Sequence, residues 1–267
     1  MIIDLNGDNK NAREPSIDPL DRGLTLGDGI FETIRVKNLI PQFYNLHMER
    51  FYKSASFLDI KIKASKEEIK TRIIKLSKLN KLKDSAVRLT LTRGYGKRGL
   101  SILGTEIANL IISINQFEPN NKPVNAMVSN LTRRNEFSPL SEIKSISYLD
   151  NIIAANEANK KGFDDAILLN TSLRVCESTI SNIFMLNDNK ILTPSLAEGA
   201  LPGTLRRVII ENYEVLETKI TLDDIQQAKE AFLTNSLSVR PLLSINGKKI
   251  GSDNSFCFSQ EILSRFF

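Results

Sequence analysis

A short segment rich in proline and asparagine, residues 117–123, is the sequence feature that most limits how this chain can fold. It separates a strand-like apolar run from an alternation of apolar and polar residues that begins at Val124. Two prolines and two asparagines in this position indicate a linker. We therefore predict an N-terminal domain over residues 1–118, a linker over 119–123 and a C-terminal domain over 124–267.

The N-terminal half combines strand and helix patterns. Residues 86–92 alternate apolar and polar side chains, which predicts a half-buried strand, and residues 107–114 resemble a more buried neighbour. The segment 65–68 is a capping box that predicts the start of a helix. Basic residues recur from 61 to 83 with no aromatic residue among them. We expect these charges, Arg72 included, to form the solvated face of that helix.

The C-terminal half combines the same two patterns. Residues 148–161 predict a helix with Leu149, Ile152, Ile153 and Ala155 on its apolar side, and Gly162 is a stop signal. Strand candidates follow at 166–169, 175–177, 184–186 and 190–193. Strand-rich halves with separate helices predict a mixed α+β fold rather than a doubly wound sheet.

The composition excludes several classes of function. The surplus of 36 Lys and Arg over 31 Asp and Glu is too small to indicate nucleic-acid binding. The single histidine, His47, lies in a helix-like segment, which favours a structural role. The two cysteines, Cys176 and Cys257, do not have the spacing of metal ligands. We therefore expect no metal site. The longest apolar stretch, 107–114, is too short to cross a membrane. Residues 1–4 lack the basic start of a signal peptide, so we expect a cytoplasmic protein.

Three separated residues form a candidate chemical site. Lys144 lies in a hydroxyl-rich segment between apolar residues, just ahead of the predicted helix. Most lysines are surface charges, so this position alone indicates no chemistry. Glu177 follows in a second hydroxyl-rich segment, and Gly203 opens an apolar helical run whose first N–H groups can bind a phosphate.

The chain resembles the class IV aminotransferases, which are pyridoxal-phosphate enzymes of fold type IV. The resemblance includes Asp21-Arg22-Gly23, the run Gly27-Asp28-Gly29-Ile30-Phe31-Glu32-Thr33-Ile34-Arg35, and Leu201-Pro202-Gly203. No single motif is decisive, but the ordered set is specific. The matching segments, in chain order, are residues 21–23, 27–35, 47–51, 143–145, 148–149, 156–158, 162–166, Glu177, 181–184 and 201–203.

The resemblance implies two α/β domains with pyridoxal 5'-phosphate between them, usually in a homodimer, and a small amino compound as substrate. By position, Lys144 would be the catalytic residue, which binds the cofactor covalently and then carries a proton. Glu177 would pair with the pyridine nitrogen, and Tyr148 would reach the ring hydroxyl. The phosphate would be bound by Arg50, the backbone N–H groups of Thr204 and Leu205, and the hydroxyl of Ser236.

These roles match the chemistry. A carboxylate stabilises the protonated ring nitrogen, which the cofactor needs in order to withdraw electrons. A lysine that acts as nucleophile and base must be a neutral amine in a shielded site. A phosphate dianion is bound well by a guanidinium and a helix N-terminus.

The loop over residues 93–101 favours one reaction within this family. Its Arg-Gly-x-Gly-x-Arg-Gly-x-Ser pattern is similar to that of aminodeoxychorismate lyases, as is the segment 135–140. The D-specific aminotransferases instead carry an arginine followed two positions later by histidine, where this chain has Arg98 and Leu100. We therefore expect a lyase that converts 4-amino-4-deoxychorismate to 4-aminobenzoate and pyruvate, a step toward folate.

Other functions stay open. An aminotransferase that acts on branched-chain or D-amino acids with 2-oxoglutarate is the main alternative, and a cofactor carrier or regulatory module on the same scaffold is another. The candidate substrate-binding residues are Arg98, Thr33 and Phe31, although a surface arginine and a strand threonine are equally good interpretations of the first two.

Overall fold

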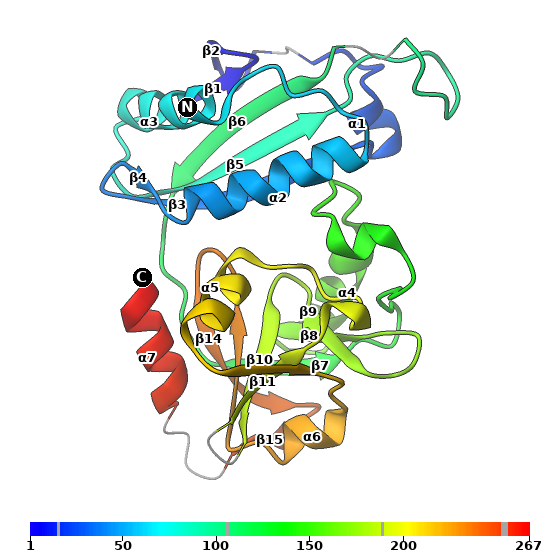
Figure 1. Ribbon diagram of the computed structural model, residues 1–267, viewed down its shortest axis with the longest axis vertical. Helices are drawn as coiled ribbons and strands as arrows, with labels where there is room; N and C mark the ends of the chain where they lie inside the picture. Colours follow the sequence, from blue (N-terminus) through cyan, green and yellow to red (C-terminus); the bar gives the residue numbers. More distant parts are fainter. Residues whose placement is uncertain (15–16, 105–106, 188–189, 252–255) are drawn as a thin grey trace. The chain divides into compact units, whose positions relative to one another are not determined.

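The computed structural model describes residues 1–14, 17–104, 107–187, 190–251 and 256–267 (Figure 1). The chain forms two compact units. Unit 1 contains Met1–Glu118 and the short segment Ile143–Ser147, and unit 2 contains Pro119–Glu142 and Tyr148–Phe267. The segment with Lys144 therefore belongs to unit 1, whereas the boundary placed from sequence put it in the C-terminal half. The chain passes between the units three times, at 118/119, 142/143 and 147/148. The segment rich in proline and asparagine marks the first of these crossings, and no such segment marks the other two.

Unit 1 is an antiparallel sheet with helices packed on it. Its described strands follow the order β2-β1-β6-β5-β3-β4. They are β1 Ile2–Leu5, β2 Asp8–Asn11, β3 Gly29–Lys37, β4 Ile40–Pro41, β5 Ser85–Thr92 and β6 Asn109–Gln116. The helices are α1 Arg22–Leu26, α2 Tyr44–Phe57 and α3 Lys66–Leu79. Figure 1 shows α2 and α3 running across the sheet, and side chains from both helices and the sheet share one apolar core.

The central strands of unit 1 confirm the alternation in the sequence. Strand β5 pairs with β3 on one side and β6 on the other, and its odd-numbered residues Val87, Leu89 and Leu91 are buried. Helix α3 begins as predicted, because the Ser65 hydroxyl accepts a hydrogen bond from the backbone N–H of Glu68. The expectation for Arg72 is wrong, because its guanidinium forms a largely buried ion pair with Asp4 of β1.

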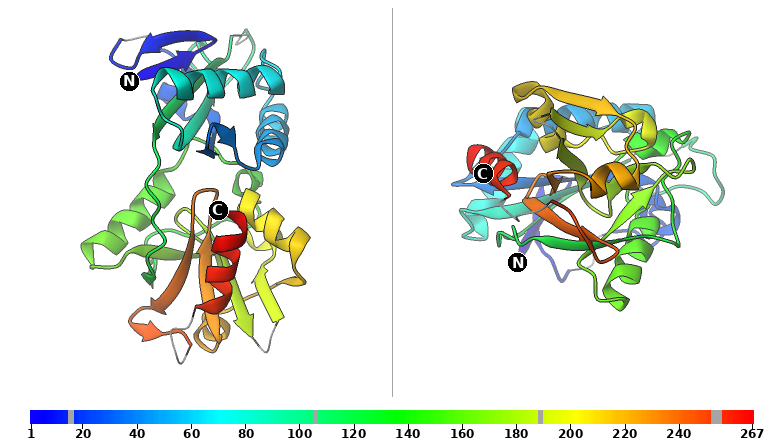
Figure 2. Two further views of the ribbon diagram at one scale, coloured as in Figure 1. Left: turned by 90° about the vertical axis from the view of Figure 1, so that its left-hand side faces the viewer. Right: turned by 90° about the horizontal axis from the view of Figure 1, so that it is seen from below.

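Unit 2 contains a larger mixed sheet. Its described strands follow the order β12-β11-β10-β13-β14-β7-β8-β9, and β15 pairs with β14. They are β7 Val124–Val128, β8 Asp165–Leu169, β9 Val175–Ser178, β10 Asn182–Asn187, β11 Lys190–Pro194, β12 Val215–Thr218, β13 Glu230–Thr234, β14 Val239–Ile245 and β15 Lys248–Lys249. The helices, some of them visible from a second side in Figure 2, are η1 Pro139–Glu142, α4 Leu149–Lys160, η2 Leu196–Glu198, α5 Thr204–Asn212, α6 Leu222–Gln226 and α7 Cys257–Phe266.

Strand β8 is buried on both faces, and this explains the unbroken apolar sequence of its residues 166–169. Ala166 and Leu168 pack against α4, whereas Ile167 and Leu169 belong to the apolar core on the opposite face. A strand covered on both sides needs apolar residues at every position.

The predicted apolar side of α4 is wrong. Its buried apolar residues are Ala154 and Ala158, while Leu149, Ile152 and Ile153 are exposed. Small side chains let the helix approach β8 closely, so the alanines rather than the large residues lie against the sheet. Among the described residues, no helix is long and apolar enough to span a membrane.

We predict that Gly94→Ala destabilises unit 1 strongly. Gly94 follows β5 with a φ of +82°, and an added Cβ would lie 1.8 Å from the backbone oxygen of Ile107. Gly162→Ala is the matched control. Gly162 has a φ of +79°, so alanine there adopts the same unfavourable backbone conformation, but no atom lies within 4 Å of the added Cβ. Urea denaturation should show a clearly larger loss of unfolding free energy for Gly94→Ala. Equal losses of unfolding free energy in the two variants would mean that the backbone around Ile107 moves away from the added Cβ at little cost.

Candidate active site

The first group of candidate site residues lies in unit 1 and is centred on Glu32, which is 1% exposed. One carboxylate oxygen accepts from Arg50 Nε at 2.7 Å, and the other accepts from Arg50 Nη2 at 2.6 Å. The second oxygen also lies 2.8 Å from His47 Nδ1. His47 and Arg50 lie three residues apart on α2, so they occupy one face of the helix and meet the same carboxylate.

The charges of this trio are set by burial and proximity. Burial opposes ionisation of Glu32, but the charge of Arg50 and the hydrogen bond with His47 outweigh it and lower the pKa of Glu32 to about 2. Burial lowers the pKa of His47, against the opposing effect of Glu32. At neutral pH the trio is thus an ionised Glu32–Arg50 pair beside a neutral imidazole. The two bonds to Glu32 fix the plane of the Arg50 guanidinium.

Lys144 lies beside the start of β3. The backbone oxygen of Lys144 accepts from Phe31 N at 2.8 Å, and Ile146 N donates to Gly29 O at 3.0 Å. The Lys144 Nζ lies 4.3 Å from the centre of the Phe31 ring. The lysine is half-buried, and its charge contributes to the lowered pKa of His47. Backbone pairing with β3 therefore places this amine within unit 1, next to Phe31 and within electrostatic reach of His47.

Strand β3 divides its predicted residues between two faces. Glu32 shares a face with the core residues Ile30 and Ile34, toward α2. Phe31 and Thr33 lie on the opposite face, because side chains alternate along a strand. The structure thus places Thr33 on the face of the Phe31 ring. Arg98, the other candidate for substrate binding, is an exposed residue of the loop after β5.

The second group of candidate site residues lies in unit 2 and is centred on Glu177. This buried residue of β9 has one carboxylate oxygen 3.1 Å from Arg134 Nε, and the other accepts from Leu201 N at 2.9 Å. Asn182, directly opposite Glu177 on β10, donates through Nδ2 to Leu201 O at 2.8 Å. Glu177 and Asn182 thus hold the backbone of the loop that leads into α5.

The N-terminus of α5 is close to the same strands. Its N-cap, Gly203, has no side chain to cap the first turn, and Thr204 and Leu205 are buried. An added Cβ at Gly203 would lie 1.9 Å from Asn182 Oδ1, so only glycine fits without displacing that amide. A helix N-terminus without a side-chain cap favours an anion.

Tyr148 and Ser236 also lie in unit 2. Tyr148 is the half-buried N-cap residue of α4. Ser236 lies in the turn after β13, where Asn235 Oδ1 accepts from the backbone N–H groups of Leu237 and Ser238. Asn235 Nδ2 also donates to Ser181 Oγ at 3.1 Å, so this turn is tied to the segment between β9 and β10.

The predicted residues therefore fall into two groups, each held by its own unit. Unit 1 holds Lys144, Arg50, Phe31, Thr33 and Arg98, and unit 2 holds Tyr148, Glu177, Thr204, Leu205 and Ser236. In the described part of the chain, no cluster of three or more His, Cys, Asp or Glu residues suited to a metal occurs.

Sequence reasoning assigned no role to Glu32, Arg134 or Asn182. For Glu32 a signal was present, because a carboxylate between Ile30 and Ile34 on the core face of a strand requires a buried partner. Arg134 and Asn182 gave no comparable signal, since their partners are far away in the sequence.

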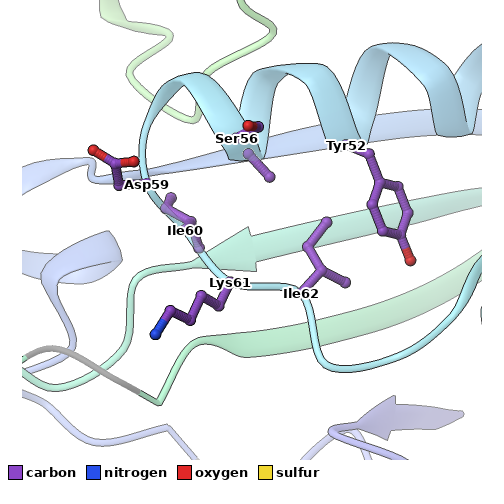
Figure 3. Close-up of a pocket in the computed structure, with 7 residues that line it drawn as sticks. Tyr52, Ser56, Asp59, Ile60, Lys61 and Ile62 are labelled. Atoms are coloured by element: carbon purple, nitrogen blue, oxygen red, sulfur yellow. The ribbon is translucent and has the colours of Figure 1, made fainter.

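A cavity of about 320 Å³ lies beside the C-terminal end of α2 (Figure 3). Tyr52 and Ser56 line it from the helix, and Asp59, Ile60 and Ile62 line it from the following segment. None of the predicted site residues belongs to its lining. This cavity is therefore separate from the two groups centred on Glu32 and Glu177.

Comparison with known proteins shows a consistent set of relatives. The family model for amino-transferase class IV matches residues 29–245. An aminodeoxychorismate lyase of Bacillus subtilis is 32% identical, over 95% of this chain and 89% of its own length. A D-alanine aminotransferase of Bacillus licheniformis is 30% identical, over 94% of this chain and 91% of its own. A branched-chain aminotransferase structure from Thermoproteus uzoniensis aligns with a TM-score of 0.91 at 26% identity, over all of this chain and 93% of its own.

We predict that Glu32 controls part of the acid stability of unit 1. Its pKa is depressed in the folded protein, so its contribution is complete above the unfolded-state pKa and is lost as pH falls from about 5 toward 2. A pKa lowered this far corresponds to a contribution of roughly 3 kcal/mol. Glu32→Gln should be less stable than wild type at pH 7, and the difference should shrink as pH falls toward 2.

Denaturant unfolding at several pH values measures this difference. Glu68→Gln, which alters a carboxylate on α3 that is 56% exposed, should follow the wild-type profile. A Glu32→Gln profile parallel to that of wild type would show that the Glu32 charge does not stabilise the fold.

Proposed function

The chain belongs to the class IV aminotransferase family and is an enzyme, and we propose that it is a pyridoxal-phosphate lyase. Its proposed reaction converts 4-amino-4-deoxychorismate to 4-aminobenzoate and pyruvate. We further propose that it acts as a homodimer in the cytoplasm, on a small amino substrate and without nucleic acid or membrane. The observation that carries the choice of reaction is the loop that presents Arg98.

The side chains of both units fit the proposed cofactor. Pyridoxal 5'-phosphate requires an amine, an anion site and a carboxylate. Lys144 offers the amine, and Arg50 offers a guanidinium that Glu32 holds in place. Helix α5 offers the N–H groups of its first turn, which begins at Gly203, where a larger residue would clash with Asn182. Glu177 would hold the pyridine nitrogen. Tyr148 would hold the ring hydroxyl, and Arg50, Thr204, Leu205 and Ser236 would hold the phosphate.

The proposed cofactor supplies an electron sink that stabilises negative charge next to the substrate amine. The residues of the chain would supply the rest. Arg134 and Leu201 N hold the carboxylate of Glu177 in place, where it would stabilise a proton on the ring nitrogen. Lys144 Nζ, half-buried and beside Phe31, would accept the proton removed from the substrate ring carbon and donate it to the departing enolpyruvyl group, which leaves as pyruvate.

The loop after β5 supports the lyase among the reactions of the family. It presents Arg98, a partner for a substrate carboxylate, and two residues later Leu100, which is 83% exposed and apolar. A histidine at position 100, as in the D-specific aminotransferases, would favour capture of a small amino acid by its carboxylate. A leucine there leaves apolar surface for a cyclic substrate such as aminodeoxychorismate. The 32% identity to the lyase of Bacillus subtilis supports the same reaction.

An aminotransferase that uses a D- or branched-chain amino acid is the second candidate. The 30% identity to the D-alanine aminotransferase over nearly the whole chain favours it. The two reactions differ in their need for a second substrate: an aminotransferase requires a 2-oxo acid to complete its cycle, whereas the lyase does not.

We predict that the purified enzyme releases 4-aminobenzoate and pyruvate from 4-amino-4-deoxychorismate with no 2-oxo acid present. Chromatography would detect the first product and a coupled dehydrogenase the second, in equal amounts. Parallel reactions would contain leucine or D-alanine with 2-oxoglutarate. Glutamate formation in these reactions, with no aminobenzoate in the first, would make the aminotransferase correct.

A further inference from the structure

Two short motifs of the sequence, around Arg22 and Asp28, form one buried contact in unit 1. Arg22 is 4% exposed, and its Nε donates to Asp28 Oδ2 at 2.9 Å. Its Nη1 donates to Gly99 O at 2.8 Å and, at 3.4 Å, to Ser101 O. Its Nη2 donates to Leu100 O at 3.4 Å. One guanidinium therefore holds three consecutive backbone carbonyls of the loop after β5.

Asp28 is shared with a second buried arginine. Arg93 Nε donates to the same Asp28 oxygen at 2.7 Å, and its other nitrogens donate to Leu58 O and Asp59 O, just beyond the C-terminus of α2. Burial opposes ionisation of Asp28, but the two arginines outweigh it and lower its pKa. Two positive charges share one negative charge, so each guanidinium is left to bind backbone carbonyls, which carry partial negative charge.

The loop that Arg22 holds has little packing of its own. Leu100 is 83% exposed, and Gly99 has a φ of +112° with nothing within 4 Å of the place where a Cβ would lie. A segment without buried side chains is positioned mainly by its backbone hydrogen bonds. Arg98 immediately precedes the first carbonyl that Arg22 binds.

We propose that Arg22 is a positioning residue for the substrate: it holds residues 99–101 so that Arg98 presents its guanidinium to a substrate carboxylate. This rests on the proposed function of Arg98. Asp28 orients Arg22, and Arg93 connects Asp28 to the end of α2. Arg22 and Asp28 thus act on substrate binding only through residues 99–101, and neither is proposed to contact a reacting atom.

A double-mutant cycle tests this. With 4-amino-4-deoxychorismate as substrate, Arg22→Gln should raise KM about tenfold and change kcat less than about threefold. Arg98→Ala should raise KM at least as much. The double variant should match Arg98→Ala alone, because Arg22 acts only through Arg98. Arg22→Lys keeps a positive charge beside Asp28 but cannot bind all three carbonyls, so it should also raise KM. This variant replaces Arg22→Gln in the test if Arg22→Gln does not fold.

Arg72→Gln is the matched control. It breaks another buried arginine–aspartate pair of unit 1, with Asp4, and should lower the melting temperature while leaving KM unchanged.

Each alternative outcome has its own meaning. If wild type forms no 4-aminobenzoate, the proposed reaction and this role of Arg22 are both overturned. If Arg98→Ala raises KM but the folded Arg22 variants do not, only the role of Arg22 is wrong. The role of Arg22 is also wrong if the increase in KM of the double variant equals the product of the two single increases, because Arg22 would then act independently of Arg98.

Discussion

The buried carboxylate of Glu32 connects strand β3 to helix α2 in unit 1 and fixes the side chains around it. Removing a charge from water is costly, and it is offset here by the bidentate bonds from Arg50 and the contact with His47. An apolar residue would fit the same face of β3 beside Ile30 and Ile34. Buried ion pairs often add little stability compared with such a residue. The trio fixes the plane of the Arg50 guanidinium, as the proposed phosphate site would require.

Both units hold loops by bonding charged or amide side chains to backbone atoms. In unit 2, Glu177 accepts from Leu201 N and Asn182 donates to Leu201 O, so the loop before α5 is held from both sides. In unit 1, Arg22 binds the carbonyls of Gly99 and its two successors. Backbone hydrogen bonds from these side chains fix the position of both loops, as the proposed ligand contacts would require.

The sequence predicted the elements whose signals are local. The alternation along β5 and the Ser65 cap of α3 both depend on neighbouring residues, and both are present. The class of fold followed from such elements, and the family from its ordered motifs, to which the family model and the relatives now add independent support.

The errors come from contacts between distant residues. Arg72 meets Asp4 of β1, which no helical pattern reveals, and α4 buries alanines because β8 lies close to it. The roles of Lys144, Arg50, Glu177 and the other site residues stay predictions, since they depend on a ligand.

The central claim, that Lys144 carries the cofactor, is tested most directly by peptide mapping. Protein loaded with pyridoxal phosphate is reduced with borohydride and digested, and the modified peptide is identified by mass spectrometry. The account predicts a single modified peptide, which contains Lys144. Lys66 is an internal control, because its amine also lies over an aromatic ring, 5.7 Å from the centre of Tyr52, and it should remain unmodified. Modification of Lys66 or another lysine in place of Lys144, or no modification at all, would contradict the account.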